Sequence, residues 1–258
     1  MPDLKVALVQ SQQFWEDKTK NFDHFERHLS VLNEPVDLIV LPEMFNTAFS
    51  MSAERIAESM QGPSIAWLKK MASSQQCALV ASLVIKENDC YFNRMVVVDR
   101  GGILAHYDKR HLFRMADEHH SYTPGNDRVI LQLNGWDILL QVCYDLRFPV
   151  FSRNKTIGNR TEYDAALYIA NWPEKRSDIW STLLRARAIE NQCYVMGVNR
   201  VGIDGNGITY SGDSQLIDPW GNVNFQFAKN QEAVKILTLH KETIEHIREA
   251  FPAFKDAD

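Results

Sequence analysis

The chain has 258 residues, of which 45% are hydrophobic and 24% are charged, and its formal net charge at pH 7 is −5. These values exclude a disordered or fibrous protein, and a chain of this length buries enough apolar surface to fold without disulfides or a structural metal. The acidic balance argues against an extended nucleic-acid surface, which needs clustered lysine and arginine. We therefore expect a globular protein in which residues 1–258 form a single domain.

The cysteine pattern indicates a reducing compartment. Cys77, Cys90, Cys143 and Cys193 include no CxxC pair, and their spacings fit neither a disulfide framework nor a common zinc motif. The first residues lack the apolar segment of a signal peptide, and no apolar run approaches the roughly 20 residues that span a bilayer. We expect a cytoplasmic protein with free thiols and no membrane partner.

Strand and helix patterns alternate through the first third of the chain. A helix is predicted over residues 18–32, where apolar residues recur at helical spacing, and a second helix opens at Gly62-Pro63, because proline suits a first turn. Short apolar runs predict the intervening strands at residues 4–9, 36–41 and 77–85.

The pattern then changes to hairpins. Residues 91–99 pair with 103–107, and Asn134-Gly135 predicts a tight turn between two further strands, 128–133 and 136–142. Later elements are strands at 164–170 and 193–199, a helix at 177–191 with Ile179, Leu183, Ala186 and Glu190 along one line, a helix at 241–250, and a loose tail over the last eight residues. Some ten to twelve strands and four or five helices fit two facing sheets covered by helices, although composition alone does not choose this over one doubly wound sheet.

Three polar residues each follow a predicted strand: Glu43, Lys109 and Cys143. Open α/β sheets bind ligands at the carboxyl ends of their strands, so these side chains have a common place to meet. A cysteine acts as a nucleophile once a base takes its proton, a carboxylate can serve as that base, and an ammonium stabilises an oxyanion. Each residue taken alone also fits a structural role, as a solvated glutamate, a loop lysine or a small buried cysteine.

The flanking residues resemble three motifs of the nitrilase, or carbon–nitrogen hydrolase, superfamily. The similar segments are Leu-Ile-Val-Leu-Pro-Glu-Met-Phe at 38–45, Tyr-Asp-Lys-Arg-His-Leu-Phe at 107–113 and Val-Cys-Tyr-Asp-Leu-Arg-Phe-Pro at 142–149. They occur in the family's order and at similar spacing. Further similarity at 122–125, 184–191 and 214–221 extends the resemblance over essentially the whole chain.

This resemblance implies an α/β fold, a four-layer αββα sandwich, and a set of catalytic roles. Glu43 would be the general base, Lys109 the oxyanion stabiliser and Cys143 the nucleophile, with the backbone N–H of Tyr144 completing the oxyanion hole. Glu118 stands where members of the family often carry a second glutamate, and it would hold Lys109 or position the substrate. No metal or other cofactor is implied.

The cysteine motif most resembles the omega-amidase branch, whose members hydrolyse the terminal amide of 2-oxoglutaramate and 2-oxosuccinamate. An anionic substrate needs cationic groups, for which Arg147 and Arg176 are candidates, with Phe113 and Trp172 as apolar walls; either arginine could equally form a structural ion pair. The loop Asn-Trp-Pro-Glu-Lys-Arg at 171–176 departs from animal omega-amidases. The family is typically dimeric or larger, which suggests a homodimer or a higher homo-oligomer with contacts at 148–157 and the terminal segment.

Several alternatives stay open at this point. Another amidase, a carbamoylase or a nitrilase of the same superfamily would use the same three residues. A papain-like thiol hydrolase would pair Cys143 with a histidine, but no histidine pattern marks such a partner. The adjacent His119 and His120 suggest a metal, although neighbouring side chains rarely converge on one ion. A non-catalytic binding protein on the same fold is the remaining class, and it would tolerate loss of the three residues.

Overall fold

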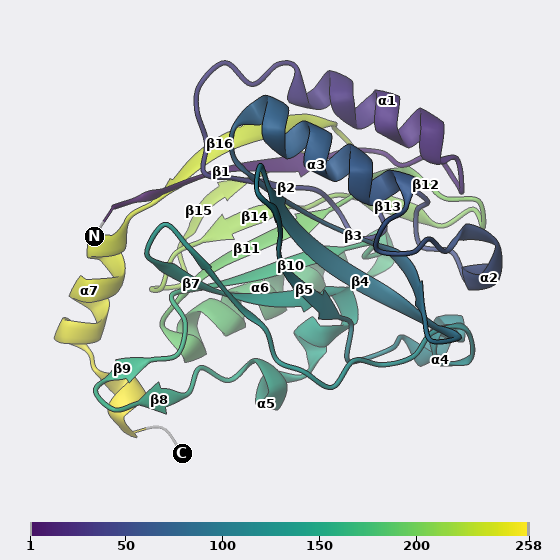
Figure 1. The fold of residues 1–258 in the computed structure, drawn as a ribbon. Coiled ribbons are helices and arrows are strands. Elements are labelled where there is room, and N and C mark those ends of the chain that lie inside the picture. The colour runs from purple at the N-terminus through teal and green to yellow at the C-terminus, as the bar shows by residue number, and fades with distance from the viewer. Residues whose placement is uncertain (1, 257–258) are drawn as a thin grey trace.

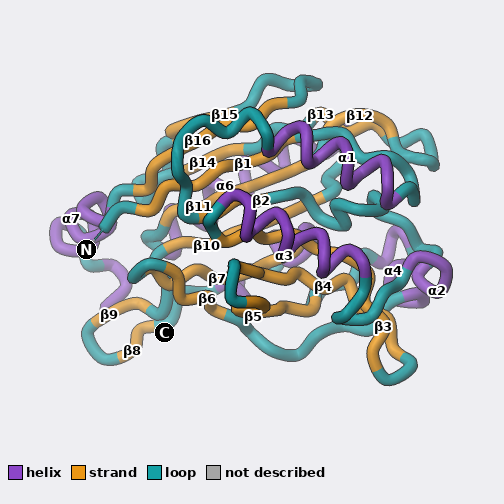
Figure 2. The backbone as a smooth tube through the Cα atoms, turned by 45° about the horizontal axis from the view of Figure 1, so that its top comes forward, coloured by secondary structure: helices purple, strands orange, loops and turns teal. Residues whose placement is uncertain are grey.

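The apolar runs of the sequence form two six-stranded sheets that face each other, in a computed structural model that describes residues 2–256 (Figures 1 and 2). The strands of the first sheet are β1 (Leu4–Gln10), β2 (Leu38–Val40), β3 (Ala78–Glu87), β4 (Cys90–Asp99), β5 (Gly102–Asp108) and β16 (Ala233–Leu239). Those of the second are β6 (Ile130–Leu133), β7 (Trp136–Val142), β10 (Ala165–Ala170), β11 (Tyr194–Asn199), β14 (Gln215–Ile217) and β15 (Val223–Gln226).

Both faces of the inner strands of the first sheet are buried, which explains their nearly continuous apolar runs. On β1, Leu4, Val6 and Leu8 pack between the two sheets, whereas Ala7 and Val9 face the opposite side. That outer face is covered by helices α1 (Lys18–Leu29) and α3 (Pro63–Gln75), which lie side by side at the top of Figure 1. The predicted second helix therefore begins at the expected proline.

The outer face of the second sheet is covered by helix α6 (Ser177–Asn191). Its buried residues include Trp180, Leu184 and Ala188. The predicted line through Ile179 is wrong, because that side chain is exposed and the buried stripe lies one residue further along. The order helix, sheet, sheet, helix is the predicted four-layer sandwich, and the single doubly wound sheet is excluded.

Strand directions bring several strand ends to the same edge of the molecule. Strands β1, β2 and β3 are parallel, and β4 is antiparallel to both β3 and β5, so β5 runs in the direction of β2. In the second sheet β7, β10 and β11 are parallel. The candidate residues that follow β2, β5 and β7 are therefore placed at strand carboxyl ends.

The remaining elements are short, and most were not predicted. They are α2 (Ala53–Ile56), α4 (Glu118–Ser121), α5 (Pro149–Ser152), α7 (Lys241–Ala250), β8 (Thr156–Ile157), β9 (Arg160–Thr161), β12 (Val201–Ile203), β13 (Thr209–Ser211) and the 3₁₀ helices η1 (Arg114–Ala116), η2 (Cys143–Arg147), η3 (Glu174–Arg176) and η4 (Ala253–Asp256). The strands of two or three residues outside the two large sheets are too short to show a periodic pattern, so the predicted number of strands was too low. No helix within residues 2–256 combines the length and apolarity needed to cross a membrane.

The predicted hairpin turn is confirmed, but the predicted loose C-terminal tail is not. The hairpin between β6 and β7 is confirmed, and both Asn134 and Gly135 have positive φ, as its tight turn requires. The loose tail is wrong for most of its length: Gln192 donates to the carbonyl of Phe251 at 2.6 Å and accepts from the N–H of Phe254 at 3.2 Å. The last two residues of that tail lie outside the described range.

Candidate active site

Glu43 lies at the carboxyl end of β2 and is fully buried. Its Oε1 accepts from the amide of Asn93 at 2.7 Å and from the ammonium of Lys109 at 3.0 Å. Its Oε2 accepts from the backbone N–H of Asn171 at 2.7 Å. These donors hold the carboxylate in one orientation and stabilise its charge in the absence of solvent.

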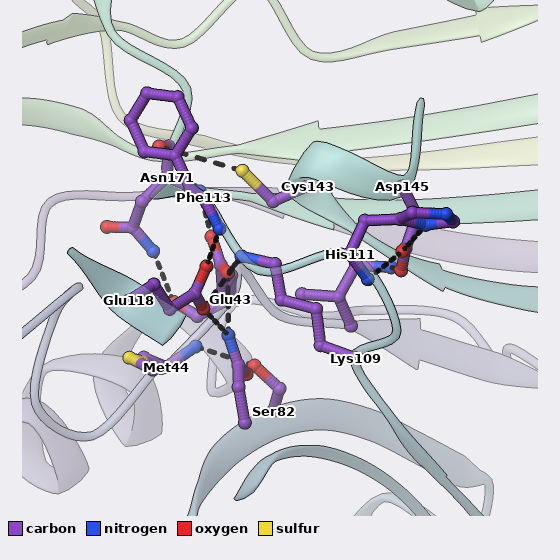
Figure 3. A network of polar contacts seen from close by, with 12 residues as sticks. Glu43, Met44, Ser82, Lys109, His111, Phe113, Glu118, Cys143, Asp145 and Asn171 are labelled. Atoms are coloured by element: carbon purple, nitrogen blue, oxygen red, sulfur yellow. Dashed lines mark hydrogen bonds and ion pairs between the residues drawn. The ribbon is translucent and has the colours of Figure 1, made fainter. Parts of the chain in front are cut away.

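Lys109 lies just after β5 and is also fully buried. Its Nζ is 3.0 Å from Glu43 Oε1 and 2.9 Å from Glu118 Oε1, and it sits 5.0 Å from the ring centre of Phe49. Glu118 is held in turn by the backbone N–H of Phe113, which donates to Oε2 at 2.5 Å. Lys109 therefore sits between two buried carboxylates (Figure 3).

Cys143 directly follows β7 and is the first residue of η2, where the chain turns tightly. Its φ is +49°, a left-handed value that is uncommon and costs roughly 1–2 kcal/mol for a residue with a side chain. The side chain is 8% exposed, and its thiol lies 3.9 Å from the carbonyl oxygen of Asn171. The thiol therefore lies beside the cluster of polar side chains that contains Glu43 and Lys109 (Figure 3).

Asp145 ties the cysteine turn to the segment that carries Lys109. Its Oδ2 accepts from the backbone N–H of Val142 at 3.0 Å and from the hydroxyl of Tyr107 at 2.7 Å. Its Oδ1 accepts from the backbone N–H of His111 at 2.9 Å and lies 2.7 Å from Nδ1 of that ring. This buried carboxylate is bonded on both oxygens, so it stabilises the strained turn at Cys143 and is itself fully satisfied.

Burial and charge together determine the protonation states at the site. Burial, and then the negative charge of Glu43, raise the pKa of the Cys143 thiol well above its usual value. Burial lowers the pKa of Lys109, but the carboxylates of Glu118 and Glu43 outweigh it and hold that pKa well above its usual value. Burial also raises the pKa of Glu118, against the opposing effect of Lys109. The resting thiol is therefore protonated beside a charged ammonium.

The loop after β10 completes the environment of Glu43. Asn171 donates its backbone N–H to the carboxylate and its side-chain amide to the Glu43 carbonyl oxygen at 2.6 Å. The next residue, Trp172, is bonded on both sides by Asn199, which accepts from its N–H at 2.8 Å and donates to its carbonyl at 2.9 Å. Asn199 thereby fixes the loop that orients Glu43.

Cys143 opens into a cavity of about 350 Å³. The sequence-predicted substrate residues Phe113, Arg147, Trp172 and Arg176 all line it. Tyr144, whose backbone N–H is the predicted oxyanion donor, lines it as well. The guanidinium of Arg147 lies 5.2 Å from a ring centre of Trp172, and that of Arg176 lies 5.2 Å from the ring of Phe113. Among the described residues neither arginine forms an ion pair with a carboxylate, so the structural ion pair considered above does not form there.

The histidines do not form a catalytic pair with the cysteine. His111 is bonded to Asp145 and stacks on Phe148 at a ring distance of 3.9 Å. Within residues 2–256 no histidine nitrogen is hydrogen-bonded to the Cys143 thiol, which argues against the papain-like alternative. His119 and His120 do converge, against the expectation for adjacent residues, since their ring centres are 3.9 Å apart beside Asp117.

Sequence reasoning missed the polar residues that orient the candidate catalytic groups: Asn93, Asp145, Asn171 and Asn199. A weak signal existed for Asn93, a polar residue in strand β4 just before its apolar run Met-Val-Val-Val. Asp145 was part of a recognised motif, but nothing in the motif assigns it a partner. The hydrogen bond from Asn171 to Glu43 joins residues 128 positions apart, which no local pattern predicts.

Comparison with known proteins now identifies the family. Residues 5–249 match the carbon–nitrogen hydrolase family. The chain belongs to this family. It is therefore a hydrolase that acts on carbon–nitrogen bonds, and the resemblance seen in the motifs is confirmed.

Named relatives of this carbon–nitrogen hydrolase cover its full length. The chain is 48% identical to the omega-amidase YafV of Escherichia coli, over 100% of this chain and 98% of the relative. It is 33% identical to the 2-oxoglutaramate amidase of Bacillus subtilis, over 97% and 96% respectively. The crystal structure of XC1258 from Xanthomonas campestris, described as a CN-hydrolase superfamily protein with an arsenic adduct in its active site, superimposes with a TM-score of 0.97 at 42% identity, covering 100% of this chain and 98% of that one.

Proposed function

We propose that this hydrolase is an omega-amidase, which converts 2-oxoglutaramate and 2-oxosuccinamate to the corresponding 2-oxo dicarboxylic acid and ammonia. Its relatives in Escherichia coli and Bacillus subtilis carry the names omega-amidase and 2-oxoglutaramate amidase. One observation supports the chemistry most strongly: a cysteine thiol facing a cavity, with a buried lysine between two carboxylates beside it. Burying these three charges together costs desolvation free energy, and a non-catalytic protein would gain no function in return.

In the proposed acylation step the Cys143 sulfur forms a bond to the amide carbon while its proton passes to Glu43. Because the thiol is protonated at rest, a base must act during the attack, and Glu43 is the carboxylate held beside it. The ammonium of Lys109 and the backbone N–H of Tyr144 bind the developing oxyanion. The carbon–nitrogen bond then breaks, and Glu43 returns the proton to the departing ammonia.

In the proposed deacylation step a water molecule enters the position left by ammonia. Glu43 accepts its proton as the oxygen attacks the thioester carbon, and the carbon–sulfur bond breaks to release the carboxylic acid. The proton is then returned to the sulfur, so Cys143 ends as a thiol. Glu118 keeps Lys109 charged and in place, because its Oε1 lies 2.9 Å from the ammonium.

The proposed substrate carboxylate binds Arg147 and Arg176 at the open side of the cavity, between the rings of Phe113 and Trp172. Arg147→Gln and Arg176→Gln should each raise KM for 2-oxoglutaramate by roughly tenfold to a hundredfold, because a charge-assisted hydrogen bond is lost. The same variants should leave KM for a neutral amide unchanged. Arg185→Gln, at an exposed arginine on α6, is the matched control.

The amide preference is tested by ammonia release from four compounds: 2-oxoglutaramate, glutamine, an N-carbamoyl amino acid and a nitrile. The proposal predicts the highest kcat/KM for 2-oxoglutaramate. A carbamoylase or a nitrilase of the same family would instead prefer the third or fourth compound, and either result would overturn the assignment.

We also propose that the chain acts as a single domain, as a homodimer, and in the cytoplasm. A reducing compartment keeps the Cys143 thiol free, as catalysis requires. Exposed apolar side chains support a contact at the predicted segments, where Val150 is 89% and Phe251 62% exposed. Light scattering on the purified protein distinguishes a dimer from a monomer.

A further inference from the structure

A second cluster of polar side chains lies outside the active site, on helix α1. His24 and His28 are four positions apart in the sequence, so their rings project from the same face of the helix. Glu232 reaches the same point from the segment that precedes β16. The Nε2 atoms of both rings lie 2.7 Å from the same oxygen, Oε2 of Glu232, and 3.2 Å from each other.

The three side chains are only partly accessible and are held in place by their neighbours. The exposed fractions of the side chains are 11% for His24, 19% for His28 and 30% for Glu232. The ring of His24 packs edge-on against Phe14 at 5.3 Å. The Ser11 hydroxyl lies 3.2 Å from Glu232 Oε2, at the end of β1. The arrangement is thus largely formed before any ligand binds, which lowers the entropic cost of binding.

We propose that His24, His28 and Glu232 form a binding site for a divalent transition metal of the zinc type. Two imidazoles and one carboxylate are a common zinc ligand set, and hard ions such as Mg²⁺ prefer oxygen ligands alone. Ligand atoms around a tetrahedral zinc ion are separated by about 3.3 Å, so the present spacings of 2.7 to 3.2 Å need to open only slightly.

The proposed ion would join two segments that are far apart in the sequence. Glu232 follows His24 by 208 residues, and the contacts that both histidine rings make to it converge on its Oε2. A metal at this point would tie α1 to the start of β16, an edge strand of the first sheet. The role is structural, since none of the three residues lines the catalytic cavity.

Arg27 supplies a specific prediction about this site. Its Nη2 lies 3.3 Å from Nδ1 of His24, so in this arrangement Nδ1 acts as an acceptor. Coordination through Nε2 requires the proton to be on Nδ1, and Arg27, which is exposed, must then turn away. Removing the guanidinium in Arg27→Ala should therefore tighten metal binding several-fold.

The test is titration of the full-length protein with ZnCl₂ by calorimetry, in a Cys143→Ala background so that the active-site thiol does not bind the ion. We expect one zinc ion per chain and a rise in melting temperature with zinc. His28→Ala and Glu232→Gln should weaken binding by about a hundredfold or more, and should lose the zinc-dependent rise in melting temperature.

The matched control is His119→Ala, which disrupts the second histidine cluster at Asp117, His119 and His120 and should leave zinc affinity unchanged. Circular dichroism of each variant verifies that it is folded. The proposal is overturned if the parent protein binds no stoichiometric zinc, if binding survives both ligand substitutions, or if His119→Ala rather than His28→Ala removes it. Weaker binding by Arg27→Ala would also contradict it.

Discussion

Lys109 keeps its charge in the solvent-free protein interior because two carboxylates flank its ammonium. Breaking a buried ion pair on one side leaves an uncompensated charge and is costly, whereas the intact group is stable. The second carboxylate is therefore essential to the arrangement: with Glu43 alone, the ammonium would be held only by the catalytic base, and the contact that fixes its other side would be lost.

Glu118→Gln tests this role of the second carboxylate. We expect kcat for 2-oxoglutaramate to fall by about a hundredfold, because a small displacement of a catalytic group costs that much, while KM changes far less. The matched control is Glu58→Gln. Glu58 is also a buried glutamate paired with a lysine, Lys18 at 2.7 Å, and it accepts from the N–H of Ser64, but it lies outside the cavity. A kcat within twofold of the parent for Glu118→Gln would show that Glu118 does not position Lys109.

At the scale of single residues, the sequence predicts the side chains that react but not those that orient them. Glu43, Lys109 and Cys143 are recognisable because catalysis needs these residue types at strand ends and within known motifs. Asn93 reaches Glu43 from another strand of the same sheet, and Asn171 reaches it from the end of a strand in the second sheet. Such contacts depend on packing between distant segments, which a single sequence does not encode in any local pattern.

At the scale of elements, the loop after β10 is held by a side chain rather than by a strand. Asn199 bonds both the N–H and the carbonyl of Trp172, and it also donates to the carbonyl of Gly212 at 2.8 Å. Asn154 bonds Tyr163 in the same way, accepting from its N–H at 3.1 Å and donating to its carbonyl at 2.9 Å. The two asparagines thus form equivalent contacts in different places.

This equivalence allows a matched comparison of Asn199→Ala with Asn154→Ala. Each substitution leaves buried backbone groups without partners. Each should therefore lower the free energy of unfolding, measured by urea denaturation, by about 1–3 kcal/mol or more. Only Asn199→Ala should also reduce kcat, because its loop carries the N–H that binds Glu43. Equal kcat values for the two variants, at a temperature where both are folded, would contradict a positioning role for Asn199.

Elements differ in how well the sequence predicts them. The long strands and helices α1, α3 and α6 follow from periodicity, which reports burial directly. The predicted buried face of α6 was wrong because the actual buried stripe includes a polar residue, Arg187. Its guanidinium donates to the carbonyl of Leu146 at 2.6 Å. The tail failed because its order comes from hydrogen bonds to Gln192, not from its own composition.

At the scale of the whole molecule, the two ends of the chain are joined through helix α7 (Figure 1). Asp3 accepts from the backbone N–H of Lys241 at 3.1 Å, and its other oxygen lies 2.8 Å from Nδ1 of His240. The hydrogen bond with His240 lowers the pKa of Asp3 below its usual value of 3.8. The carboxylate of Asp3, just before β1, therefore holds the start of α7.

The lowered pKa gives a signed prediction for stability. A carboxylate whose pKa is lower in the folded state contributes stability above its ordinary pKa, and this contribution is lost as pH falls below 3.8 towards the folded value. Asp3→Asn should therefore destabilise the protein at pH 6 and have a smaller effect at pH 3, as measured by urea denaturation. An equal effect at both pH values would show that the charge of Asp3 is not involved.

The central claim is that Cys143 carries the acyl group of the substrate. The most direct measurement is intact-protein and peptide mass spectrometry of the enzyme quenched during turnover of 2-oxoglutaramate. We predict an increase equal to the mass of the substrate minus ammonia, located on Cys143, and neither adduct nor turnover in a folded Cys143→Ala variant. An adduct on Cys77, Cys90 or Cys193, or undiminished ammonia release by Cys143→Ala, would contradict the mechanism.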